Sequence, residues 1–221
     1  MALKLPAALL DRANAAGLLR RYWATHPDGS PVYSGSRFER LGGRGGRRVA
    51  ENRFTAEDFV AVAMLSVSVR AHAVLRVLEP TEPSPYNRLL HEIPADLDLV
   101  DAGPEHIAQD SPAWELWTRL QEIRGIGPVG AGKLLARKRP RLLPVYDSVT
   151  KKVFQRPVRD LAFWSDVRTE LRRDQRSLVA HFEAVRETAE LGKDISVLRI
   201  LDTTAWLHGT DVMGNQSGRS S

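Results

Sequence analysis

The 221-residue chain lacks cysteine and any long apolar run. Without cysteine it can form neither disulfides nor thiolate zinc or iron–sulfur sites, and it has no Cys nucleophile. No stretch of about 18 consecutive apolar residues is present, so no membrane-spanning helix is expected. The short apolar stretch at residues 5–10 is interrupted by Asp11 and Arg12, which argues against a secretory signal. We therefore expect a soluble cytoplasmic protein, associated with the nucleoid if its source is bacterial.

Clustered metal ligands and a nucleotide-hydrolysing loop are also missing from the sequence. The six histidines are scattered along the chain, without the clustering with carboxylates that a metal site needs. Gly132-Lys133 superficially resembles a phosphate-binding loop, but Leu134 stands where that loop requires Ser or Thr, and no strand is expected before it. We therefore reject nucleotide hydrolysis.

The composition is that of an ordinary globular protein, with 43% hydrophobic and 27% charged residues. Apolar residues recur at helical spacing, which predicts a mainly α fold with a short β-hairpin or irregular loop near 32–54. The apolar stretch 59–78 is expected to be one buried central helix. The expected organisation comprises an N-terminal helical region with a Gly/Arg loop (1–80), a second helical domain (86–208) and a disordered tail (209–221). The two helical regions could equally form one compact domain.

The net charge of +5 is distributed unevenly. Residues 124–156 hold nine basic side chains and one acid, Asp147, which gives this window +8 and leaves −3 for the rest of the chain. A local field of this size favours a polyanionic partner, and nucleic acid is the obvious class. The alternative is that the basic residues only form a solvated helical face.

A glycine turn lies at the start of this basic window. An apolar helix is expected to end at Gly125-Ile-Gly127, and a second helix to begin at Pro128, a favoured first helical position. Such a turn lets backbone N–H groups and the positive end of a helix dipole hold one phosphate. We interpret six basic residues as further phosphate contacts: Lys133, Arg137, Lys138, Arg139, Lys151 and Lys152. The alternative is a glycine-rich corner between two helices that binds no ligand.

The sequence around this turn resembles a known family. Residues 123–131 are similar to the hairpin of helix-hairpin-helix DNA-binding proteins, and Pro144-Val-Tyr-Asp147 resembles the segment that follows it in the helix-hairpin-helix DNA glycosylase superfamily. The resemblance implies a helix-hairpin-helix, glycosylase-like helical domain that binds DNA. It covers about residues 112–156. The whole chain also resembles an uncharacterised bacterial family that carries this hairpin.

The resemblance assigns roles to particular residues. It makes Asp147 the catalytic carboxylate, which stabilises an oxocarbenium-like sugar or activates water after the base is extruded. It implies that backbone carbonyls of Gln121, Ile123 and Ile126 hold a monovalent cation. The hairpin residues that it places against DNA are Gly125, Gly127, Val129 and Gly130.

Departures from the family pattern narrow the expected chemistry. Val129 stands where lyase-competent glycosylases carry their Schiff-base lysine, so a monofunctional enzyme without lyase activity is expected. The absence of cysteine excludes the iron–sulfur subgroup, and apart from the monovalent cation no cofactor is implied. Asp147 is equally well placed to be a helix N-cap.

Three functions remain open at this stage. The chain is a monofunctional DNA N-glycosylase of base excision repair, a non-catalytic module that holds the duplex backbone, or a helical protein whose basic face meets an acidic protein. The sequence does not specify the base, the preference for DNA or RNA, the oligomeric state or the role of residues 1–110.

Overall fold

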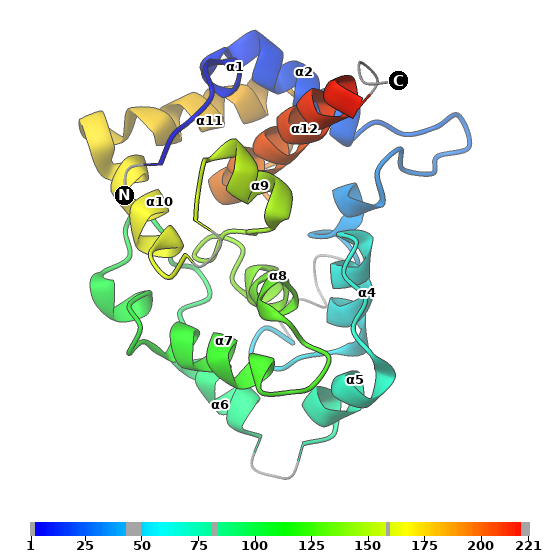
Figure 1. Cartoon of the computed structure of the whole chain (residues 1–221), viewed down its shortest axis with the longest axis vertical. Coiled ribbons are helices and arrows are strands. Elements are labelled where there is room, and N and C mark those ends of the chain that lie inside the picture. Colours follow the sequence, from blue (N-terminus) through cyan, green and yellow to red (C-terminus); the bar gives the residue numbers. More distant parts are fainter. Residues whose placement is uncertain (1–2, 43–49, 81–83, 158–159, 218–221) are drawn as a thin grey trace. The chain divides into compact units, whose positions relative to one another are not determined.

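The computed structural model describes residues 3–42, 50–80, 84–157 and 160–217, and most of these residues are helical (Figure 1). The predicted mainly α fold is confirmed. No β-strand occurs in the four described ranges, where an isolated bridge joins Thr25 and Pro31. None of the helices in these ranges is long and apolar enough to cross a membrane.

The β-hairpin expected near residues 32–54 is wrong for the described part of that range. Ser34–Arg37 forms the 3-10 helix η1, and the residues after it continue as turns. The Phe38 amide donates to the Gly35 carbonyl at 3.1 Å, a local bond that replaces cross-strand pairing. The irregular-loop alternative therefore holds here, while residues 43–49 of the Gly/Arg run lie outside the described residues.

The chain divides into two compact units. The terminal unit combines residues 1–33 with residues 145–221, and the central unit comprises residues 34–144. This division differs from the boundary expected near residue 80, because helix α2 (Arg12–Tyr22) packs on α11 (Ser177–Thr188) and α12 (Val197–Ser217). Long-range packing therefore places the first helices with the last ones.

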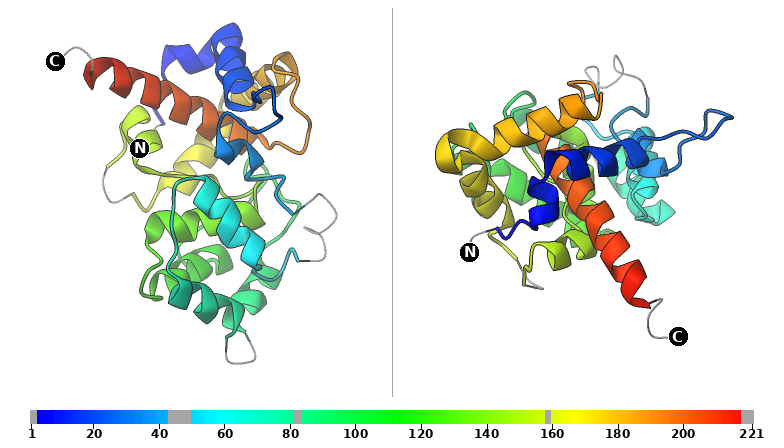
Figure 2. Two further views of the ribbon diagram at one scale, coloured as in Figure 1. Left: turned by 90° about the vertical axis from the view of Figure 1, so that its right-hand side faces the viewer. Right: turned by 90° about the horizontal axis from the view of Figure 1, so that it is seen from above.

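The terminal unit contains six α-helices and the 3-10 helix η3 (Arg173–Arg176) in its described residues. Besides α2, α11 and α12 the α-helices are α1 (Ala7–Leu10), α9 (Ser148–Val153) and α10 (Phe163–Arg172). Both views in Figure 2 show α9 beside α12. Their close approach depends on Gly209, because a Cβ there would lie 2.6 Å from Val153 Cγ2 and 2.7 Å from Val149 Cγ1.

The polar tail expected to be disordered from residue 209 is helical through Ser217. Helix α12 does not end at the glycine, because Gly209 is a packing position against α9 rather than a C-cap. The correction applies to residues 209–217, and residues 218–221 lie outside the described ranges.

The central unit packs its helices around α8 (Pro128–Lys138). Figure 1 shows α8 nearly end-on between α4 (Ala56–Met64) and α7 (Pro112–Gln121), and both of these helices contact it. Helix α6 (Pro85–Glu92) packs on the other side of α7. The 3-10 helix η2 (Pro104–His106) lies in the connection from α6 to α7.

The single central helix expected over residues 59–78 is wrong. Helix α4 ends at Met64, Ser66 has a positive φ of 60°, and α5 (Ala71–Leu78) begins seven residues after Met64. The connecting residues pack against α8, where Val67 Cγ1 would lie 3.4 Å from a Cβ on Gly130. The break therefore gives α8 a close neighbour and turns α5 into a separate helix with an exposed face.

Candidate nucleic-acid interface

The glycine turn forms the connection between α7 and α8. Its backbone reverses at Gly125, whose φ of +107° is unfavourable for residues with a side chain. The Ile126 amide closes the turn by donating to the Ile123 carbonyl at 2.9 Å. Trp117 Nε1 donates to the Pro128 carbonyl at 3.1 Å and so ties α7 to the first turn of α8. These contacts thus hold α7, the turn and α8 together.

The turn presents an accessible helix N-terminus. Gly125 and Gly127 are exposed, and a Cβ on Gly127 would meet no atom within 4 Å. Gly127 is the N-cap of α8, so no side chain caps this end, and the first turn of α8 carries no acid. Within the described part of the chain, the first amides of the helix and the positive end of its dipole therefore have no capping side chain.

The other two predicted hairpin residues are less accessible. Val129 is half-buried, and Gly130 is buried where α8 packs on residues 65–70. The lack of a side chain at Gly130 allows this close packing, because an added Cβ would touch both Val67 and Ile126. Contact of these two residues with DNA stays a prediction that involves their backbone amides.

The predicted cation ligands lie at the C-terminal end of α7 and in the turn that follows it. Gln121 is the last residue of α7, and Ile123 and Ile126 lie in the turn. The final carbonyls of a helix lack intrahelical donors and carry the negative end of the dipole, which suits a cation. The Ile123 carbonyl already accepts the bond that closes the turn, so one of its lone pairs is engaged. These backbone carbonyl oxygens are of a kind that can bind a monovalent cation, and the assignment stays a prediction.

Two of the predicted phosphate contacts lie in the interior of the central unit. Lys133 and Arg137 are only 3% and 4% exposed. Lys133 Nζ donates to the Leu65 carbonyl at 2.8 Å. Arg137 donates to the Leu41 carbonyl at 2.6 Å, and its Nε lies 3.3 Å from Asp58 Oδ1. The expectation that these side chains face phosphate is corrected: they join α8 to the chain around it.

Lys138 and Arg139 are engaged in the same way. Lys138 pairs with Asp58 and donates to the Ala50 carbonyl at 3.0 Å, and burial lowers the pKa of Lys138 although Asp58 opposes the shift. Arg139 is fully buried, and it donates to the carbonyls of Ile93 and Leu90 at the end of α6. Burial lowers the pKa of Arg139 to about 10. The prediction that Lys138 and Arg139 contact phosphate is therefore corrected, because both side chains make structural contacts inside the central unit.

Beside these residues lies a polar pocket of about 170 Å³ at the C-terminal end of α8. Its lining holds four acidic side chains and three basic ones: Glu51, Glu57, Asp58 and Asp96 against Arg137, Lys138 and Arg141. The pocket therefore has no excess positive charge that would select a polyanion.

Other basic residues of the window are compensated by acids outside it. Arg141 pairs with Asp98 on the surface. In the terminal unit, buried Arg156 pairs with Asp160 at 2.6 Å and with Asp166 at 2.5 Å. Four carboxylates outside the window, Asp58, Asp98, Asp160 and Asp166, thus offset part of the charge of +8 that the sequence assigns to it.

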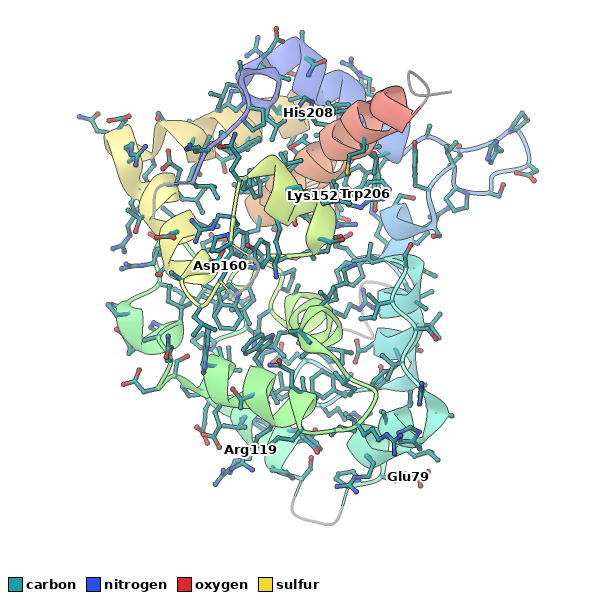
Figure 3. The ribbon with its side chains drawn as sticks, in the orientation of Figure 1. Glu79, Arg119, Lys152, Asp160, Trp206 and His208 are labelled. Carbon is teal, nitrogen blue, oxygen red and sulfur yellow. The ribbon has the colours of Figure 1, made fainter. Side chains whose placement is uncertain are left out.

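Lys151 and Lys152 lie on α9 in the terminal unit. Lys151 is half-buried with its Nζ 5.0 Å from the centre of the Tyr146 ring, a cation–π contact. Lys152 is exposed and is labelled in Figure 3, with its Nζ 4.0 Å from Met213 Sδ. The role of both lysines in phosphate binding stays a prediction.

Sequence reasoning missed basic residues that lie beside the turn. Arg70, the N-cap of α5, has its Cβ 3.6 Å from where a Cβ on Gly125 would stand. His72 Nε2 bonds to the Arg124 carbonyl at 2.7 Å. Arg70, His72 and Arg124 are all exposed. No local signal could have identified this contact, because 52 positions separate His72 from Arg124 in the chain.

Asp147 has the geometry of a helix cap. Its Oδ1 accepts hydrogen bonds from the Val149 amide at 3.0 Å and the Thr150 amide at 3.1 Å, while its own amide donates to Thr150 Oγ1 at 2.9 Å. This is the reciprocal capping box of a helix start. The carboxylate is half-buried and belongs to the terminal unit, whereas the glycine turn belongs to the central unit.

A buried polar network holds the segment before Asp147. The hydroxyl of Tyr146 donates to Asp160 Oδ2 at 2.7 Å, and its ring stacks on Phe163 with centroids 3.6 Å apart. Burial raises the pKa of Tyr146 above its ordinary value, and the bond to Asp160 adds to the shift. For Asp160, labelled in Figure 3, burial raises the pKa, but hydrogen bonds from Arg156 and Tyr146 outweigh this and lower it.

Comparison with known proteins gives one family match. The model of a family of unknown function, DUF6308, matches residues 15–209, which is most of the chain. Searches of the curated proteins and of the solved structures give no match.

Proposed function

Because the chain belongs to a family of unknown function, DUF6308, we propose a function from its own residues: it binds DNA by holding the duplex backbone at the turn between α7 and α8. The observation that carries this proposal is the exposed N-terminus of α8, where Gly127 leaves space for a ligand atom and no acid is present in the first helical turn. A phosphate oxygen is the natural acceptor for such amides.

The surroundings of the turn support an anion rather than a cation or an apolar ligand at this end. Arg124 precedes the turn and Arg70 adjoins it, and both are exposed. Neither makes an ion pair with any residue in the described ranges. The resemblance of residues 123–131 to DNA-binding hairpins points to the same ligand. Backbone contacts of this kind give affinity without reading the base sequence.

The test compares two substitutions at Gly127, using an undamaged DNA duplex and gel shifts across a salt series. Asp and Asn are both good N-caps, so Gly127→Asp and Gly127→Asn should each fold as well as the wild type. The Asp variant places a carboxylate where the phosphate would lie, so its affinity should fall by about tenfold or more, whereas Asn should retain more of the affinity.

Wild-type binding should weaken steeply as the salt concentration rises from about 50 to about 200 mM, because binding releases counterions. Equal affinities for the Asp and Asn variants would remove the turn from the interface. Absence of any salt-sensitive DNA binding by the wild type would reject the proposed function and favour a protein partner.

N-glycosylase activity is the second candidate, and the half-exposed carboxylate of Asp147 at a helix start supports it. Asp147→Asn tests it well, because Asn preserves the cap while removing the charge. On a panel of lesion-bearing duplexes, the wild type should generate abasic sites on one lesion and the variant should not. If the two proteins are equally inert on every duplex, Asp147 is a cap only and the protein is a binding module.

A further inference from the structure

The exposed side of α5 carries His72 and Arg76 in addition to Arg70, which adjoins the turn. Ala73 and Val77 of this helix face the core. His72 and Arg76, four residues apart and hence on neighbouring turns of one face, are exposed. Arg70 stands at the N-terminal end of the same helix and is also exposed. The helix therefore buries one apolar face, and its outer surface carries these basic side chains together with the exposed Leu75.

This surface adjoins the glycine turn. A Cβ on Gly125 would lie 3.5 Å from Ala73 Cβ and 3.6 Å from both Arg70 Cβ and His72 Nε2. The bond from His72 Nε2 to the Arg124 carbonyl joins the first turn of α5 to the residue before Gly125. Figure 1 shows the connection between α7 and α8 running beside α5 within the central unit. The exposed side of α5 and the glycine turn thus form one continuous surface.

The arginines of this surface lack compensating carboxylates. Arg70, Arg76 and Arg124 form no ion pair or side-chain hydrogen bond with any described residue, in contrast to Arg137, Arg141 and Arg156. The first turn of α5 contains no acid, and no side chain caps its N-terminus. Glu79, labelled in Figure 3, is the C-cap at the far end of the helix. Arg70 and Arg124 therefore place positive charge at the end of α5 that meets the turn, and Arg76 lies in the last turn of the helix.

We propose that Arg70 and Arg76 on α5, with Arg124 in the turn, form a second phosphate-binding surface that takes the DNA backbone next to the phosphate held by α8. This inference rests on the proposed function and extends it. The turn supplies backbone amides for one phosphate, while the arginines supply mobile charged donors for neighbouring phosphates. The recognised partner is the sugar–phosphate backbone of a duplex, without selection of a base sequence.

The test measures DNA affinity across a salt series for a double variant, Arg70→Gln with Arg76→Gln. Each lost arginine–phosphate contact should reduce the slope of log affinity against log salt by about 1, so the double variant should lose about 2. Its affinity at low salt should fall by about tenfold or more. Its thermal unfolding should match the wild type, because both side chains are exposed.

Arg119→Gln is the matched control. Arg119 also lies in the central unit, but Glu115 already pairs with it at 2.8 Å, and Figure 3 shows it on the side of α7 away from α8. The control should leave the salt slope unchanged. A loss of about 1 in the slope of the control would mean that net charge alone matters, and would overturn the proposal.

The outcomes separate this inference from the proposed function. If Gly127→Asp weakens binding while the double variant retains the wild-type slope, the turn binds DNA and the α5 surface does not. If the wild type does not bind DNA, both proposals fail. Loss of slope in the double variant alone, with Arg119→Gln unchanged, supports the second surface.

Discussion

The ammonium group of Lys133 donates a hydrogen bond of 2.8 Å to the carbonyl of Leu65, the C-cap residue of α4. The two residues are 68 positions apart in the chain, and the lysine is almost fully buried. A basic residue one turn beyond a glycine turn was expected to meet phosphate. In the structure it satisfies a carbonyl at a helix end, which intrahelical bonding leaves without a donor.

Replacing Lys133 by Met should separate stability from binding. Met retains much of the length of the side chain but removes the hydrogen bond to Leu65, which leaves that carbonyl without its donor. We expect a loss of about 1–3 kcal/mol in the free energy of unfolding, measured by urea denaturation. The salt slope of DNA binding should not change. A slope reduced by about 1 would instead show that Lys133 reaches a phosphate.

Arg139→Met should be more destabilising than any surface arginine substitution. Arg139 donates to the carbonyls of Ile93 at 2.8 Å and Glu51 at 2.8 Å, and further contacts surround it. Loss of these buried bonds should cost about 3 kcal/mol or more, again measured by urea denaturation.

The control for Arg139 is Arg141→Met, because Arg141 is half-exposed and makes a surface pair with Asp98. An exposed pair contributes about 0–1 kcal/mol, so this variant should remain close to the wild type. Equal stabilities for the two variants would contradict the assignment of Arg139 as a structural residue.

Asp160 should make stability depend on pH in the acidic range. The pKa of its carboxyl is lowered from 3.8 in the folded chain, with burial opposing the shift and the bonds from Arg156 and Tyr146 producing it. Between the folded and unfolded pKa values the unfolded chain binds more protons, so stability falls as the pH falls. The contribution is present above about pH 4 and is lost as the pH drops through the lowered pKa.

Asp160→Asn should remove this pH dependence and should cost about 3 kcal/mol at pH 7, because it breaks a buried pair with Arg156. Unfolding curves at pH 7 and at pH 3 provide the measurement. The stability difference between wild type and variant should shrink at the lower pH. Asp98→Asn, which breaks an exposed pair, serves as the control and should cost no more than about 1 kcal/mol. A difference that stays constant with pH would contradict the assignment.

The sequence predicted the local structure well where the signal was itself local. Gly127 with Pro128 marks the start of α8, because fixed proline geometry acts within a few residues. The same kind of signal identified Asp147 as an N-cap candidate. Predictions failed where a distant contact decided the outcome, as in the break after Met64 and the continuation of α12 beyond Gly209.

The amino-acid sequence by itself determined that the chain is mainly helical and that a glycine turn opens α8, since helix formation and turn geometry depend on near neighbours. Only the tertiary structure decided which positive charges remain available to a partner. Asp58 neutralises Arg137 from 79 residues away, whereas Arg70 reaches the turn at Gly125 from another helix. Electrostatic compensation depends on distance in space and on burial, and neither can be counted along the chain.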